Sequence, residues 1–212
     1  MKKEEGLQIK SKALEININS YRIEVEIDPK YSVLLEVMSK YYGLMDGLKT
    51  FLKELSHPYK NWHFIVKEAR SYSLDYFHLL RNHPKGHEAA ELFVDIFDNA
   101  IESGNNTDVK IEAVDNLLLF LLKIIKDSGP DIERFMTVIE NTFQRITHYP
   151  DDDFFLFVKS PYQLKKLVEA LLNYSSTFTN GFQTINQLLL RYFKHSYSCW
   201  LKEDDPQEWF EK

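Results

Sequence analysis

The chain has 212 residues, of which 26 are basic and 32 acidic, so its formal net charge is −6 at pH 7. Only 7 residues are glycine, about half the usual share, which disfavours phosphate-binding loops and hairpin-rich β folds, because both depend on positive φ angles. The acidic balance, with basic residues scattered along the chain, argues against a protein that binds nucleic acid.

Residues 13–27 differ from the rest of the chain because apolar and polar residues alternate, which is the pattern of a β-strand. The phase of the alternation flips at Asn19-Ser20. A turn there would make a β-ribbon that places Ile16 opposite Ile23, while a single strand arm with a bulge is the rival. Either form is marginal alone. We expect it to dock on the helical body, on the remainder of a longer polypeptide, or on a second copy to make a homodimer.

From residue 28 onward the apolar residues recur at three- and four-residue steps, and prolines or glycines interrupt the pattern at regular intervals. Asp28 and Pro29 are typical of a helix start, and Thr107 can cap another helix. These signals predict about seven helices, at 28–56, 58–80, 85–103, 107–126, 130–147, 161–173 and 181–202, with a short helix at 152–159 and a loop at 175–181.

The predicted fold class is all-α, with a single helical domain over residues 28–202. Short loops make successive helices antiparallel, which suits an irregular antiparallel bundle or a HEAT-like stack, and both remain open. The helix at 107–126 is apolar on nearly all sides, so we expect it at the centre. Residues 1–12 are expected to be a mobile leader, and residues 203–212 an acidic tail that folds back onto the body, or a truncated linker.

Features that direct a protein to a membrane or out of the cell are absent from the pattern. The start, Met1 to Glu5, is charged and no apolar segment of a secretory signal follows it. The longest uninterrupted apolar run, Leu117 to Leu122, is far below the roughly 20 residues of a membrane span. The single cysteine excludes an internal disulfide. We therefore expect a cytoplasmic protein without a membrane partner.

Three histidines form the first candidate site. His78, His83 and His87 lie around the break between two predicted helices, with carboxylates nearby, so they could hold zinc or iron. Pro84 separates His83 from His87, and no paired motif recurs on another helix as a di-iron bundle would need. The sequence therefore favours a structural role for these histidines, and no metal or cofactor.

An acidic stripe runs along the predicted helix at 85–103. Its members follow steps of 3, 4, 3 and 4 residues, which places them on one side of a helix: Glu88, Glu91, Asp95, Asp98 and Glu102. The stripe is interpreted either as a solvated face that meets lysines from a neighbouring helix, or as the binding site for a basic protein partner.

The aromatic residues near the end of the chain have a simpler interpretation. Leu189, Tyr192, Phe193, Tyr197 and Trp200 follow helical spacing, so we expect them to pack as one buried face. On the same helix, His195 and Cys199 are four residues apart, but nothing nearby supplies the other groups that a thiolate nucleophile needs. No catalytic residue is predicted.

Four segments resemble the N-terminal helical region of large bacterial PEP/pyruvate-binding, pyruvate phosphate dikinase-like proteins: 27–31 (IDPKY), 55–62 (LSHPYKNW), 74–80 (LDYFHLL) and 115–122 (DNLLLFLL). The resemblance covers about residues 14–212. In that family ATP-grasp elements and a phosphorylatable histidine carry the chemistry, and this chain has neither, because His57 lacks the glycine- and threonine-rich setting. The resemblance thus implies an accessory domain of a larger enzyme and transfers no functional residue.

The pattern as a whole favours a non-catalytic helical interaction or regulatory domain, accessory to a larger PEP/pyruvate-utilising enzyme. Its partner would be another protein or the remainder of a longer polypeptide. The alternative is a helical bundle that binds a small molecule or a metal near His78, His83 and His87.

Overall fold

The computed structural model describes residues 13–18, 21–39, 45–104, 106–158, 161–177 and 181–200. The predicted leader at 1–12 and tail at 203–212 lie outside these residues. The elements are β1 (Ala13–Ile18), β2 (Tyr21–Glu26), α1 (Ser32–Met38), α2 (Met45–Ser56), α3 (Trp62–Arg70), α4 (Phe77–Asn82), α5 (Gly86–Ser103), α6 (Thr107–Asp127), α7 (Met136–His148), α8 (Asp151–Val158), α9 (Pro161–Thr177) and α10 (Gly181–Trp200). The all-α class expected from the sequence is confirmed for the helical body.

The N-terminal strands form an antiparallel ribbon. β1 pairs with β2 so that Ile16 lies opposite Ile23 and Ile18 opposite Tyr21, which is the register that a turn at residues 19–20 predicts. The ribbon leads directly into the helical body at Ile27, whose side chain is fully buried. Pairing between copies through residues 13–27 stays a prediction.

The single helix predicted over 28–56 is wrong. The chain makes a 3₁₀ turn over Pro29–Tyr31, then α1, which ends at Met38, and α2, which begins at Met45. The expected start is confirmed, because the Asp28 carboxylate accepts a hydrogen bond from the Lys30 amide at 3.1 Å. The Asp28 amide also donates to Ser56 Oγ at 2.9 Å, which ties the beginning of α1 to the end of α2.

The predicted helix at 58–80 also differs. It begins only at Trp62, because Asn61 is the residue whose side chain caps the helix, accepting from the Phe64 amide. It is then interrupted by a π-helical stretch, Ser71–Asp75, before α4 completes it. The prediction did not anticipate either feature.

Later boundaries agree better with the sequence. α5 and α6 begin and end within one residue of the predicted bounds. The predicted helix at 130–147 starts as a 3₁₀ stretch, Gly129–Phe135, and continues as α7. α9 runs through Thr177 where a loop was predicted, and the hydroxyls of Ser175 and Thr177 donate to carbonyls of the preceding helical turn.

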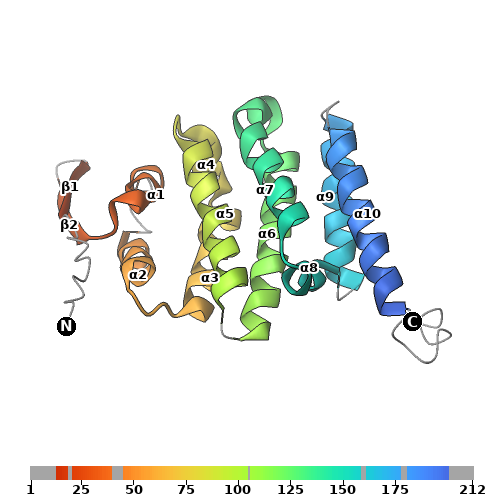
Figure 1. Cartoon of the computed structure of the whole chain (residues 1–212). Helices are drawn as coiled ribbons and strands as arrows, with labels where there is room; N and C mark the ends of the chain where they lie inside the picture. The colour runs from red at the N-terminus through yellow and green to blue at the C-terminus, as the bar shows by residue number, and fades with distance from the viewer. Residues whose placement is uncertain are drawn as a thin grey trace, which may run out of the picture.

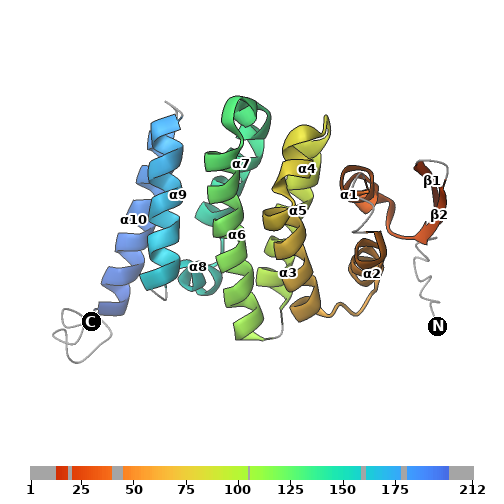
Figure 2. The same cartoon turned by 180° about the vertical axis from the view of Figure 1, so that it is seen from behind.

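The helices are arranged in layers that follow chain order from the ribbon to α10 (Figure 1). α5, α7 and α10 form one side of the stack, with α7 in contact with both others. α3, α6 and α9 form the other side, seen from behind in Figure 2, with α6 between α3 and α9. Of the two arrangements expected from the sequence, the described helices form the stack. α9 and α10 together make its last layer.

α6 lies at the centre, as its apolar sequence predicts. It contacts α3, α5, α7, α8 and α9. Phe120 of α6 is fully buried and meets Phe77 of α4 and Phe93 of α5 edge to face, with ring centroids 6.3 and 6.0 Å apart. One connected core therefore extends through the described body, from Ile27 to Leu188.

The start of α6 carries a testable correction. The sequence points to Thr107 as the cap, but the Asn106 side chain accepts the hydrogen bond from the Asp108 amide at 2.8 Å. Asn106→Ala is therefore expected to lower the free energy of unfolding by about 1 kcal/mol, and Thr107→Ala by clearly less. Urea unfolding of both variants measures this, and an equal loss in the two would contradict the assignment.

Candidate functional site

The three histidines of the first candidate site have different surroundings. His78 is exposed, whereas His83 is buried and its Nδ1 accepts from the Lys85 amide at 3.1 Å. Arg134 reaches the same turn from the 3₁₀ stretch before α7 and donates to the Arg81 and His83 carbonyls. Within the described residues no three His, Cys, Asp or Glu side chains are grouped so that they could hold a metal ion. The structure therefore gives the alternative metal site no support.

The acidic stripe is not one continuous surface. Glu88 and Glu102 are exposed, Glu91 and Asp95 are half-buried, and Asp98 is buried. A partner protein could therefore meet the two ends of the stripe directly, but not the Asp98 carboxylate.

Arg145 of α7 occupies the middle of the stripe. Its Nη1 donates to Asp95 Oδ1 at 2.5 Å and to Asp98 Oδ2 at 2.7 Å. The other Asp98 oxygen accepts a hydrogen bond from the Tyr149 hydroxyl. The neighbouring helix thus supplies a cation, as the solvated-face interpretation expected, although the cation is an arginine.

Burial governs the electrostatics of this group. It raises the pKa of Asp98, while the hydrogen bonds from Tyr149 and Arg145 oppose the rise. Burial and the adjacent Asp98 carboxylate raise the pKa of Tyr149 well above its ordinary value. Both groups take part in an internal hydrogen-bond network that links α5 to α7 and to the residue that follows α7.

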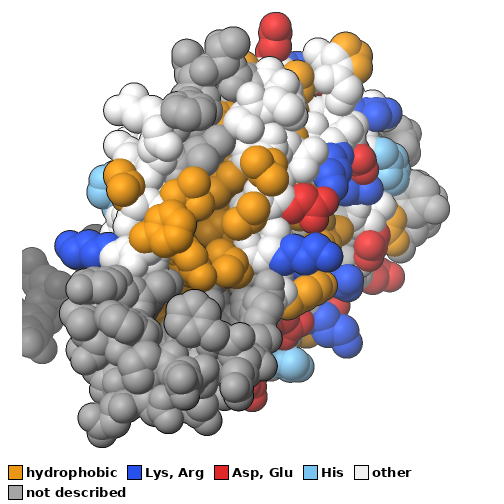
Figure 3. All heavy atoms as spheres, turned by 90° about the vertical axis from the view of Figure 1, so that its right-hand side faces the viewer, with side chains coloured by type: hydrophobic (Ala, Val, Ile, Leu, Met, Phe, Trp, Pro, Cys, Tyr) orange, Lys and Arg blue, Asp and Glu red, His pale blue; other side chains and the backbone are white. Residues whose placement is uncertain are grey.

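The outer side of the last layer is the most distinctive surface. Five large apolar side chains are exposed among the described residues, and four of them belong to α9 and α10. Leu172 is 61% exposed, Leu190 68% and Phe193 63%, and we call these three residues the α9–α10 face. The fourth, Tyr162, has the Lys166 ammonium 3.8 Å from its ring centroid. Figure 3 looks onto this end of the molecule and shows hydrophobic side chains gathered into one patch.

This surface corrects the prediction for the last helix. Phe193 was expected in a buried aromatic face, but α10 buries Leu188, and Leu190 and Phe193 face outward. The side chains of Tyr197, Trp200, His195 and Cys199 lie outside the described residues. The run Leu188-Leu189-Leu190 was the available signal, because three consecutive apolar residues cannot all lie on the one side of a helix that packs against its neighbours.

Basic residues outnumber acidic residues on the two helices that carry the α9–α10 face. Glu169 is the only acidic residue in the sequence of α9 and α10, and it accepts a hydrogen bond from Lys126 of α6. Lys165 and Lys194 are exposed on the same two helices. The α9–α10 face is therefore apolar and lies on two helices with an excess of basic residues.

Comparison with known protein families, with curated proteins and with solved structures finds no match for this chain. Within the described residues, every helix is too short or too polar to cross a lipid bilayer.

Proposed function

We propose that the chain is a non-catalytic helical interaction module, and that the α9–α10 face receives an amphipathic helix with acidic flanks from a partner protein. The observation that supports this is the gathering of exposed apolar side chains on the last layer. Burying Leu172, Leu190 and Phe193 would remove a large apolar area from water, which is the main driving force of association.

A helix is the occupant that the arrangement favours. Each inner layer of the stack is covered by the next: α6 lies against α9, and α7 against α10. A helix laid on α9 and α10 would continue the same packing of ridges into grooves. The excess of basic residues on α9 and α10 favours an acidic partner over a second copy of the same basic surface.

The accessory role implied by the family resemblance is part of the same proposal. A larger PEP/pyruvate-utilising enzyme would then be the source of the helix, either as a separate protein or as the remainder of a longer polypeptide.

A peptide of stated sequence type tests the face directly. The probe is a fluorescent amphipathic helix as long as α10, 20 residues, with leucine on one side and glutamate elsewhere. The control peptide carries lysine in place of every glutamate. We expect the acidic peptide to bind at least about tenfold more tightly in fluorescence anisotropy, a difference of about 1.4 kcal/mol. Phe193→Glu should weaken binding of the acidic peptide by a similar factor.

Tyr59→Glu is the control, because Tyr59 is 86% exposed on the loop after α2 and lies outside the face. It adds the same charge and should leave peptide binding unchanged. Equal binding of the two peptides would refute the proposal. So would self-association that Phe193→Glu abolishes in analytical ultracentrifugation, since that result assigns the face to a second copy.

A further inference from the structure

A second surface lies at the opposite end of the stack, where the N-terminal turn, the loop between α2 and α3, and α5 enclose a cleft of about 270 Å³. Its lining combines two lysines, small polar side chains and apolar walls: Lys30, Tyr31, Leu55, Pro58, Lys60, Trp62, Ile96, Asn99 and Ser103. The volume is slightly below the range of about 300–1,000 Å³ for drug-sized ligands, so the cleft suits a small molecule.

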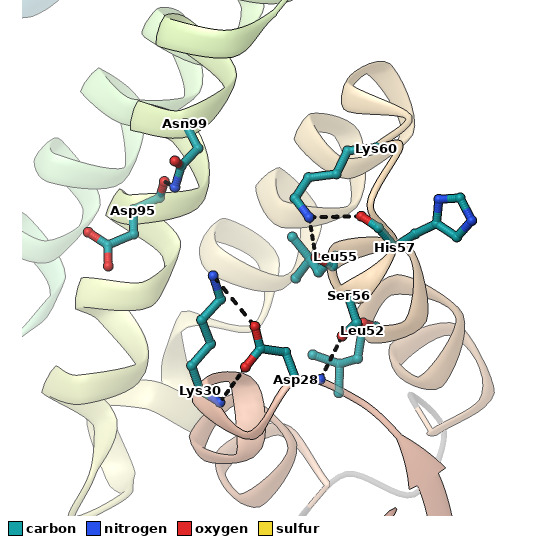
Figure 4. A network of polar contacts seen from close by, with 9 residues as sticks. All are labelled: Asp28, Lys30, Leu52, Leu55, Ser56, His57, Lys60, Asp95 and Asn99. Atoms are coloured by element: carbon teal, nitrogen blue, oxygen red, sulfur yellow. Dashed lines mark hydrogen bonds and ion pairs between the residues drawn. The ribbon is translucent and has the colours of Figure 1, made fainter. Parts of the chain in front are cut away.

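Two ammonium groups converge on this cleft from separate segments. Lys60 Nζ donates to the carbonyl oxygens of Leu55 and His57, at 2.6 and 3.0 Å, and so caps the end of α2. Lys30 Nζ lies 3.8 Å from Asp28 Oδ2 and 4.7 Å from the centroid of the Tyr31 ring. Figure 4 shows both side chains extending toward the space between them, beside Asn99 of α5.

The residues that line the cleft include two lysines and no acidic side chain, although Asp28 and Glu54 lie close by. Asp28 forms an ion pair with Lys30, and the nearby Asp95 forms an ion pair with Arg145. Burial, together with the neighbouring Lys30 ammonium, lowers the pKa of Lys60. Lys60 caps α2, whereas Lys30 caps no helix: its ammonium lies 3.8 Å from Asp28 and its side chain is 55% exposed. An anion placed between the two ammonium groups would relieve their repulsion.

We propose that this cleft binds a small organic anion, with a carboxylate or phosphate group between the Lys30 and Lys60 ammonium groups. The hydroxyls of Tyr31 and Ser103 and the Asn99 amide are the further polar groups within the lining. The organic part of the ligand lies against the apolar walls formed by Leu55 and Trp62. This site is separate from the α9–α10 face, and its failure would leave the interaction module untouched.

Isothermal titration calorimetry with phenyl phosphate, benzoate and the uncharged benzamide tests the site. We expect the intact chain to bind at least one of the two anions with a Kd of about 1 mM or tighter, and benzamide at least about tenfold more weakly. Lys30→Gln should weaken binding of the anion at least about tenfold. Lys30 is exposed and caps no helix, so circular dichroism should show an unchanged fold.

Ser103→Asp is the second variant, because it places a carboxylate in the lining and should abolish anion binding. Thr137→Asp is its matched control: Thr137 is exposed on α7, outside the cleft, and the change in net charge is the same. The stronger of the two anions identifies the head group. Absence of binding by both anions, equal binding of benzamide, or undiminished binding by Ser103→Asp would each overturn the proposal.

Discussion

Phe120→Ala is expected to lower the free energy of unfolding by about 3–5 kcal/mol, a large fraction of the total stability of a domain of this size. Phe120 is fully buried in α6, and its ring contacts Phe77 of α4 and Phe93 of α5. Truncation removes these contacts and leaves a cavity where three helices meet. Urea unfolding followed by circular dichroism measures the loss.

Phe193→Ala is the matched control, because the same truncation is made at a side chain that is 63% exposed. Its effect on the free energy of unfolding should stay within about 0.5 kcal/mol. A loss below about 1 kcal/mol for Phe120→Ala would show that α6 does not hold the layers together at this point. Because Phe193→Ala removes a side chain of the α9–α10 face, it should also weaken binding of the acidic peptide, with the free energy of unfolding nearly unchanged.

The helices that sequence analysis predicts most closely are those whose two ends are marked by local chemistry. α5 begins at Gly86, one residue after the predicted start, and ends where predicted, at Ser103 before Gly104. α6 keeps a continuous apolar pattern over 21 residues. In both cases the signal for the helix and the signal for its ends lie within the helix or next to it, so no distant residue is needed to predict them.

The break between α2 and α3 shows why other boundaries were missed. Pro58 is typical of a helix start, yet the chain stays irregular until Asn61. The Asn61 amide donates to Glu54 Oε1 at 2.7 Å, and Lys60 reaches back to the end of α2. These side chains make hydrogen bonds to backbone groups of the loop and of the end of α2. Such contacts cannot be predicted from the periodicity of apolar residues. The π-helical stretch after α3 is likewise invisible in the sequence.

The candidate sites divide in the same way. Spacing predicts that Asp95 and Asp98 lie one turn apart on α5, but it cannot show that Asp98 is buried or that Arg145, about 50 residues later in the chain, meets both. The α9–α10 face and the Lys30–Lys60 cleft depend on which sides of helices remain uncovered and on which segments lie together. Those properties belong to the packing of the layers, and they require the structure.

Arg145→Met is expected to lower the free energy of unfolding by about 2–3 kcal/mol at neutral pH. Removing one partner of a buried ion pair costs about 3–5 kcal/mol, because the other charge stays buried without compensation. The Arg145 side chain is 42% exposed, so solvent screens part of the interaction and the expected loss is smaller. Lys123→Met, which breaks the i,i+4 pair with Asp127, is the control and should cost about 0.2–0.5 kcal/mol.

The loss of stability in Arg145→Met should depend on pH. The direction of this dependence follows from the burial of Asp98. The pKa of Asp98 is raised in the folded protein, so ionisation of this carboxyl costs stability as the pH rises from the ordinary value of 3.8 through the folded pKa. Arg145 offsets that cost only where Asp98 is ionised. The difference between wild type and Arg145→Met should therefore be largest at pH 7 and shrink as the pH falls toward about 3.5, where Asp98 is mostly protonated in both.

A double variant separates charge from packing. In Arg145→Met with Asp98→Asn no buried charge remains, and the amide oxygen still accepts the hydrogen bond from Tyr149. Stability at pH 7 should then recover most of the loss seen in the single variant, and its dependence on pH between 3.5 and 7 should flatten. A double variant no more stable than Arg145→Met would show that the arginine acts through the packing of its aliphatic stem, and the ion pair would not be what joins α5 to α7.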